Sequence, residues 1–132
     1  MSDPAFELQK ALVAALKADG ALPPATGVYD SVKPNVPFPY VTLGPCQVVP
    51  MKADCIDGAD VFSQIDVWSQ GVGYPEAKRI AKAVVSALDD RDLAIDGHRT
   101  VLFEHQSTNY LREPDGKTSH AAIVFHGSFT SL

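Results

Sequence analysis

The sequence predicts one α+β domain over residues 1–132, a two-layer sandwich in which two helices cover one face of a mostly antiparallel sheet of about four to six strands. Two stretches, 8–16 and 77–88, repeat apolar residues at helical spacing. Other stretches, above all 60–69 and 119–130, alternate in the manner of strands. Short turns join most of these strands, which favours antiparallel neighbours.

The first helix is expected to begin at segment 2–4, where Ser or Asp can cap free amides and Pro suits the first turn. Gly20 is expected to end it. Phe6 and Val13 lie seven positions apart and therefore share a second face of the helix. That face is expected either to lie partly under a loop or to contact another subunit. The main apolar stripe consists of Leu8, Ala11, Leu12, Ala15 and Leu16.

Two strand candidates lie between the first helix and the centre of the chain. Residues 28–32 form a short one, and three prolines within 33–39 predict a rigid loop or a sheet edge after it. Residues 40–43 form the second. The Gly-Pro pair that follows is expected to end this strand, although residues 47–49 can extend it as far as the next proline.

Residues 51–59 predict an ordered loop or a hairpin arm, because polar turn formers surround the buried-type pair Cys55 and Ile56. Met51 and Asp57 belong to the same segment. Loops at the rim of a scaffold often carry function, so this segment is a candidate contact surface.

The strand at 60–69 is expected to be the centre of the sheet. The face of this strand that points away from the helices combines the large aromatics Phe62 and Trp68 with polar residues, a combination that often marks a protein interface. The alternative is that loops of the same chain cover these two aromatics. The face expected to meet the helices carries Val61, Ile65 and Val67.

Pro75 suits the first turn of the second helix, which lies after a Gly-rich turn. The helix is expected to lie close to the sheet, since its stripe includes small alanines. An Asp-Gly dipeptide at 96–97 predicts a hairpin-type turn after it. The apolar stripe of this helix consists of Ala77, Ile80, Ala81, Val84, Val85 and Leu88.

The most secure hairpin joins a long strand over 98–112 to a strand over 119–130 through a tight turn at 114–116. Val101 and Phe103 are expected to point to the same side of the first strand. Polar residues at 106–109 interrupt its pattern and allow a bulge.

The bulk composition excludes several classes of protein. A formal net charge of −5 and a pI of about 5.2 argue against tight, sequence-independent binding of nucleic acid. The two cysteines, Cys46 and Cys55, are nine positions apart, which is neither a zinc spacing nor a redox motif. A reducing compartment suits so few cysteines. The N-terminus lacks a signal-peptide pattern, and no apolar run approaches the length of a membrane span.

We expect no catalytic residue, no cofactor site and no metal site. The serines lack a nucleophile-elbow motif, and the histidines lack metal-binding spacing. Cys55 lies between two aspartates, which oppose a thiolate. An enzymatic pairing stays open as an alternative, because sequence distance hides spatial contact; it would join Cys55 to His98, His105, His120 or His126.

Several short motifs, taken together and in order, resemble those of the tail-completion or tail-terminator family of long-tailed phages and gene transfer agents, formerly a domain of unknown function. They cover nearly the whole chain. Each motif is weak by itself, and their order and spacing carry the resemblance. The motifs are Pro37-Phe-Pro-Tyr40-Val-Thr-Leu-Gly44, Asp54-Cys-Ile-Asp-Gly58, Asp66-Val-Trp-Ser69, Glu76-Ala-Lys78, Gly97-His98, Asp115-Gly116 and His120.

The resemblance implies a structural virion protein without catalytic residues. It implies a homo-oligomeric ring, usually six-fold, that caps the head-proximal end of the tail tube, stops tube polymerisation and joins the head-side connector. DNA would pass through its lumen without specific binding, and no membrane would be involved. The protein would be made in the cytoplasm of the bacterial host. The alternatives are a head-tail adaptor or stopper ring of the same particle, and the small Cys/His enzyme.

The interface candidates come from four regions. They are the second face of the first helix, the segment 51–59, the aromatic face of the central strand, and the region 106–117 around the last turn. The residues are Phe6, Val13, Met51, Cys55, Ile56, Asp57, Phe62, Trp68, Asn109 and Arg112.

Overall fold

A computed structural model of the chain describes residues 3–31, 35–53 and 56–132. No helix in these ranges is long and apolar enough to cross a membrane. The predicted α+β class is confirmed, since the described residues form five strands and two helices. The elements in chain order are α1 (Ala5–Lys17), β1 (Gly27–Tyr29), β2 (Tyr40–Ala53), β3 (Ile56–Ser69), α2 (Pro75–Leu88), β4 (His98–Arg112) and β5 (Ser119–Ser131).

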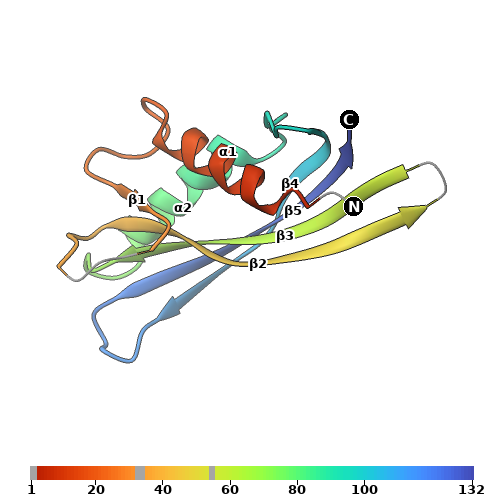
Figure 1. Cartoon of the computed structure of the whole chain (residues 1–132). Coiled ribbons are helices and arrows are strands. Elements are labelled where there is room, and N and C mark those ends of the chain that lie inside the picture. The colour runs from red at the N-terminus through yellow and green to blue at the C-terminus, as the bar shows by residue number, and fades with distance from the viewer. Residues whose placement is uncertain (1–2, 32–34, 54–55) are drawn as a thin grey trace.

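Both helices lie on one face of the sheet and leave the opposite face bare (Figure 1). The predicted apolar stripes are confirmed, since their large residues are buried between the two layers. The helix-facing side of β3 is buried as predicted. Burial of each such aliphatic side chain contributes about 1.5–3 kcal/mol, so this layer supplies most of the stabilisation. The fully buried side chains include Leu8, Leu16, Val61, Ile65, Val67, Ile80 and Leu88.

The ends of α1 differ slightly from the prediction. The helix begins at Ala5 with Pro4 at its N-cap position and without a side-chain cap, so the expected capping by Ser or Asp with Pro in the first turn is wrong. Asp3 accepts a hydrogen bond from the Ala5 amide over 2.9 Å. The helix ends at Lys17, however, and Gly20 lies in the turn beyond it with φ of +75°. The glycine therefore permits the turn and does not cap the helix directly.

The sheet has the order β1-β2-β3-β5-β4, so that β3 is central as predicted. Among the described strands, three of the four pairings are antiparallel, and the pairing of β1 with β2 is parallel. The short strand β1 begins one residue earlier than expected and ends at Tyr29. Both of these parallel strands follow α1 in the sequence, and residues 30–39 connect them.

The expectation that Gly44 and Pro45 end the second strand is wrong. β2 continues to Ala53, and a register shift between Leu43 and Cys46 absorbs the two residues as a bulge. The glycine is required here, because a Cβ at position 44 would contact the Asp66 carboxylate and the Gln64 carbonyl. Beyond the bulge β2 continues to pair with β3, whose pairing with β5 stops at Gly58. Past that point only β2 and β3 continue, as a short two-stranded arm, which confirms the hairpin alternative for residues 51–59 (Figure 1).

The predicted hairpin of β4 and β5 is confirmed, with its turn at Gly116, where φ is +72°. The predicted bulge is present, between His105 and Ser107. A second register shift lies between Thr100 and Leu102 and breaks the expected alternation. In consequence Phe103 is buried, whereas Val101 is 58% exposed. The Asp-Gly turn at 96–97 forms, but the residues before it form no strand.

Candidate interaction surfaces

The bare face of the sheet holds two flat stacks of aromatic rings. We define this face by alternate residues of the two central strands. Each of the two aromatics expected here is half-buried and stacks against an imidazole of β5. The bare-face residues are Asp60, Phe62, Gln64, Asp66 and Trp68 of β3, and His120, Ala122, Val124 and His126 of β5.

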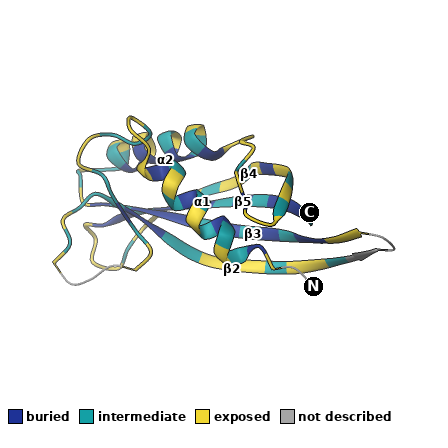
Figure 2. Ribbon diagram, turned by 45° about the horizontal axis from the view of Figure 1, so that its top comes forward, coloured by how far each residue is buried: buried dark blue, intermediate teal, exposed yellow. Residues whose placement is uncertain are grey.

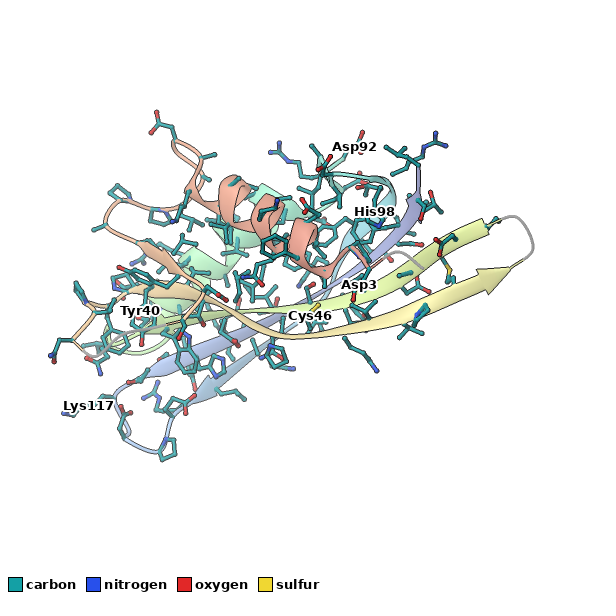
Figure 3. The ribbon with its side chains drawn as sticks, viewed as in Figure 1. Asp3, Tyr40, Cys46, Asp92, His98 and Lys117 are labelled. Atoms are coloured by element: carbon teal, nitrogen blue, oxygen red, sulfur yellow. The ribbon has the colours of Figure 1, made fainter. Side chains whose placement is uncertain are left out.

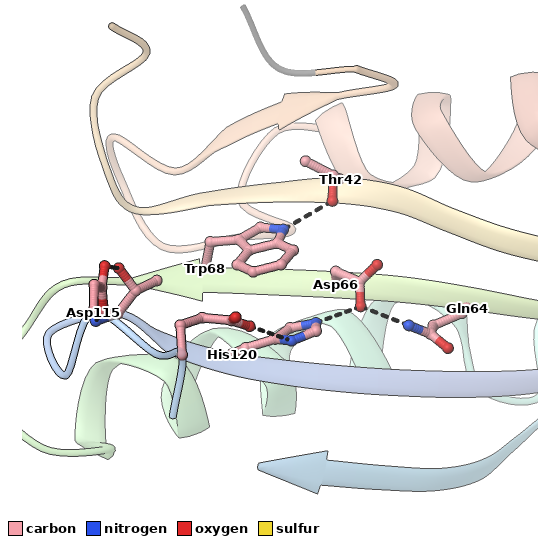
Figure 4. A network of polar contacts seen from close by, with 8 residues as sticks. Thr42, Gln64, Asp66, Trp68, Asp115 and His120 are labelled. Carbon is pink, nitrogen blue, oxygen red and sulfur yellow. Dashed lines mark hydrogen bonds and ion pairs between the residues drawn. The ribbon is translucent and has the colours of Figure 1, made fainter. Parts of the chain in front are cut away.

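The first stack consists of His120 and Trp68, which are direct cross-strand partners with ring centroids 4.0 Å apart (Figure 4). The His120 Nε2 atom lies 2.6 Å from Asp66 Oδ1, and its Nδ1 atom lies 3.0 Å from Glu113 Oε1. Because both ring nitrogens face carboxylates, only the imidazolium form can donate to both. Hydrogen bonds to carboxylates are stronger than those between neutral groups, and the same imidazole lies flat on the face of an indole.

Further polar contacts fix the residues around this stack. Trp68 donates its indole N–H to Thr42 Oγ1 over 2.9 Å, which joins β3 to β2. The Gln64 side chain donates to the same Asp66 oxygen over 2.8 Å. Tyr40 lies opposite Trp68 in the register, and burial raises the pKa of its hydroxyl. The network therefore connects β2, β3 and β5 across the bare face.

A second stack of the same kind lies six residues farther along each of the two strands. His126 and Phe62 are cross-strand partners with ring centroids 4.8 Å apart and planes inclined by 14°. The His126 Nε2 atom lies 3.1 Å from Asp60 Oδ1, and Nδ1 lies 3.9 Å from Glu104 Oε1. The second set is looser and more exposed than the first, with 24% exposure of the His126 side chain against 12% for His120.

Neither histidine network was predicted from the sequence, because His120 and His126 contact partners 54 and 66 positions away in the chain. The readable signal was the repeated Asp-x-aromatic pattern at 60–62 and 66–68. These networks can stabilise a sheet face that neither of the described helices covers.

The described residues give the enzymatic alternative no support. His98 Nδ1 lies 3.0 Å from the Asp96 carbonyl, so its ring closes the turn. His105 Nε2 lies 2.7 Å from Thr108 Oγ1. Cys55 lies outside the described residues. Within those residues, no group of three or more His, Cys, Asp or Glu side chains is arranged to hold a metal ion.

The β2–β3 arm exposes candidate residues at the end of the sheet (Figure 2). Ile56 is 52% exposed. Met51 is half-buried and pairs with Gly58, two residues along β3 from Ile56. Asp57 is exposed and accepts a hydrogen bond from the Ser131 hydroxyl over 3.1 Å. The register places the β4–β5 turn at the opposite end of β3 from this arm.

Residues 10–127 match the family model described as Tail completion protein gp17. The chain belongs to this family. A curated relative, the tail completion protein gp17 of Bacillus phage SPP1, is 28% identical over 117 residues, which cover 88% of this chain and 87% of the relative. A chain in the virion of a native gene transfer agent particle superposes with a TM-score of 0.89 at 30% identity, covering 99% of this chain and all of that chain.

Membership of the gp17 family confirms the resemblance found in the sequence. The protein is a structural component of a phage-type tail and belongs to the virion or phage-like particle. The match covers β1 to β4, α2 and most of β5, so the bare face, the arm and the last hairpin lie almost wholly within the part of the chain that matches the family.

One of the two candidates on α1 of this gp17-family protein, Phe6, borders a pocket. Phe6 is 67% exposed, so the expected cover by a loop is absent from the described structure, and Lys10 Nζ lies 4.9 Å from its ring centroid. Val13 is half-buried. Cys46 lies beneath α1 (Figure 3). It lines, together with Phe6, Leu8 and other residues, a mostly apolar pocket of about 270 Å³.

The remaining two candidates lie near the end of β4. Asn109 and Arg112 are both exposed. The Arg112 guanidinium carbon lies 4.8 Å from the centroid of the Tyr74 ring. The structure thus separates the sequence candidates into three places, namely the arm, the start of α1 and the end of β4, with Phe62 and Trp68 on the bare face between them.

Proposed function

We propose that this protein assembles into a six-fold ring on the head-proximal end of the tail tube. The ring stops tube polymerisation and presents a surface to the head-side connector. DNA passes through its lumen, and the net charge of −5 suits passage without binding to phosphates. The observation that carries this proposal is the arrangement of two hairpins at opposite ends of one sheet.

The two hairpins suit contacts along the axis of a ring. The arm ends near Ile56, and the β4–β5 turn lies near Gly116, at the far end of the central strands. A ring of identical chains in one orientation would present all arms on one side and all turns on the other. One side can then bind the last ring of tube protein, while the other side binds a chemically different partner.

The sheet itself suits head-to-tail association. It is open, with β1 and β2 at one edge and β4 at the other. These edges differ from each other, so a contact between them is heterologous, and a heterologous contact whose rotation closes gives a ring. The start of α1, with the exposed Phe6 side chain, is a further candidate for the seam between subunits.

The proposal is tested by adding the purified chain to polymerising tube protein of the same particle and measuring tube lengths by electron microscopy. Wild-type protein should shorten the tubes and appear as a ring at one end. Ile56→Asp should abolish capping, because a charge replaces an exposed apolar contact on the arm. The matched control is Val72→Asp, since Val72 is 100% exposed in the loop before α2. Tubes of unchanged length with wild-type protein would contradict the proposal.

The two alternative functions predict other outcomes. A stopper ring would occupy the joint on the head side of the connector, so labelled protein in whole particles separates it from a terminator. A Cys/His enzyme would lose its activity in Cys55→Ala and His98→Ala variants while assembly persisted. If no activity of the protein depends on Cys55 or His98, the enzyme alternative fails, and if labelled protein lies at the tube end, the stopper alternative fails.

A further inference from the structure

We infer that neighbouring copies of this chain meet edge to edge, with the end of β4 on one copy added to β1 on the next. This inference rests on the proposed ring and specifies the surfaces that close it. The partner is therefore a second copy of the chain. The evidence is the set of backbone groups left open on β4, the position of β1, and the charges beside each edge.

Only part of the β4 edge is open. The loop after α2 already occupies its middle: the Asp90 amide donates to the Phe103 carbonyl over 2.9 Å. The His105 amide donates to Asp89 Oδ1 over 2.8 Å. These bonds protect the edge there against addition of a strand. A strand of another copy could therefore pair with the segment of β4 after the bulge, residues 107–112.

The backbone direction on this segment follows from the turn beyond it. The Glu113 amide donates to the Thr118 carbonyl over 2.8 Å, so Glu113 faces β5. Residues of an antiparallel ladder alternate between facing their partner strand and facing away. The amides and carbonyls of Tyr110 and Arg112 therefore point to the open side of the sheet.

On the opposite edge of the sheet, the strand that lies level with residues 107–112 of β4 is β1. The registers place Val28 level with Tyr110, through one residue of each intervening strand. The Gly27 amide donates to the Pro39 carbonyl over 3.3 Å, toward β2, so the groups of Val28 point outward. The rest of this edge is less suitable, because β2 contains Pro45 and Pro50, which lack amide donors.

The strand directions also agree. β1 is parallel to β2, and three successive antiparallel pairings connect β2 to β4. β4 therefore runs opposite to β1. Copies that share one orientation around a ring would pair these two edges as antiparallel strands, which is the stronger of the two pairing modes.

The side chains beside the two edges are complementary in charge. Beside β4, Lys78 Nζ lies 5.2 Å from the Tyr110 ring centroid, and Arg112 lies over Tyr74. Among the described residues, neither cation has a carboxylate within ion-pair distance. Beside β1, Asp19 and Asp30 are exposed. Asp19 and Val28 line a pocket of about 430 Å³. Lys17 also borders this pocket and offsets the charge of Asp19, so the net negative charge beside β1 comes from Asp30.

The test is a charge exchange measured by ring formation in mass photometry and negative-stain microscopy, with and without tube ends. Lys78→Glu with Arg112→Glu should lower the ring fraction at least tenfold, and so should Asp19→Lys with Asp30→Lys. The fourfold variant, with both edges reversed, should recover rings. The control is Lys82→Glu with Arg91→Glu, which changes the net charge equally at other exposed positions.

A backbone variant completes the test. Tyr110→Pro removes an amide that faces the open edge and leaves the bonds to β5, so it should abolish rings while circular dichroism shows an intact fold. If this variant does not fold, the charge exchange still decides. Rings of wild-type abundance in the Lys78→Glu/Arg112→Glu variant, or no recovery in the fourfold variant, would overturn the edge contact and leave the proposed function standing. Absence of rings in the wild type, alone and on tubes, would overturn both.

Discussion

The imidazole of His120 lies flat against the indole of Trp68, with 4.0 Å between ring centroids and 10° between ring planes. The same imidazole contacts Asp66 on β3 and Glu113 after β4. One side chain of β5 thus joins both neighbouring strands on a face that lacks helices. The looser copy of this arrangement at His126 provides an internal comparison for measuring its value.

Replacement of the two histidines should have unequal effects. His120→Ala should lower the free energy of unfolding by about 2 kcal/mol, because it removes two close charge-assisted contacts and a ring stack. His126→Ala should cost about 1 kcal/mol or less, since its contacts are longer and more exposed. Urea unfolding of the two variants measures the difference. Equal losses would show that the carboxylate contacts contribute little.

The hydrogen bond from Trp68 to Thr42 should contribute about 1 kcal/mol. Trp68→Phe removes the donor but keeps a ring beneath His120, and Thr42→Val removes the acceptor. A double-mutant cycle isolates the bond from the lost ring area. If the two single losses add fully in the double variant, the bond makes no contribution to stability.

Gly44→Ala should destabilise the protein by about 1–3 kcal/mol through overpacking. The new Cβ would contact the Asp66 carboxylate, which is held by His120 and Gln64. The substitution should therefore also perturb the His120 ring signals in an NMR spectrum. Gly97→Ala is the comparison, since a Cβ there meets no neighbour but the backbone has φ of +76°. An effect confined to Gly97→Ala would show that only backbone conformation matters.

Asp115→Ala should weaken the β4–β5 turn in a pH-dependent manner. Hydrogen bonds from the Thr118 side chain and amide and the Lys117 amide lower the pKa of Asp115. A lowered carboxyl pKa stabilises the fold above the pKa of the unfolded chain, and this contribution disappears as the pH falls through the folded pKa. The difference in melting temperature between wild type and variant should therefore be present at neutral pH and shrink in strong acid. A difference independent of pH would assign the effect to the loss of side-chain bulk.

Much of the fold was predictable because it depends on short-range periodicity. The stripes ending at Leu16 and Leu88 and the alternation around Ile65 define which faces are buried, whatever the topology. The arm at 51–59 was one of two predicted alternatives, and the strand through Gly44 was predicted to end there. A Gly-Pro dipeptide predicts the end of a strand from local composition. Here β2 pairs with β3 both before and after this dipeptide, so it forms a bulge.

The candidate surfaces depended much more on the tertiary structure. The sequence by itself determined that Phe62 and Trp68 share a face with Asp66, because residues of a strand alternate in direction. Only the tertiary structure decided that His120 and His126 cover them, and that Asp89 closes the middle of β4. Those contacts join residues far apart in the chain, and their geometry follows from strand order and register, which a single sequence does not encode in any local pattern.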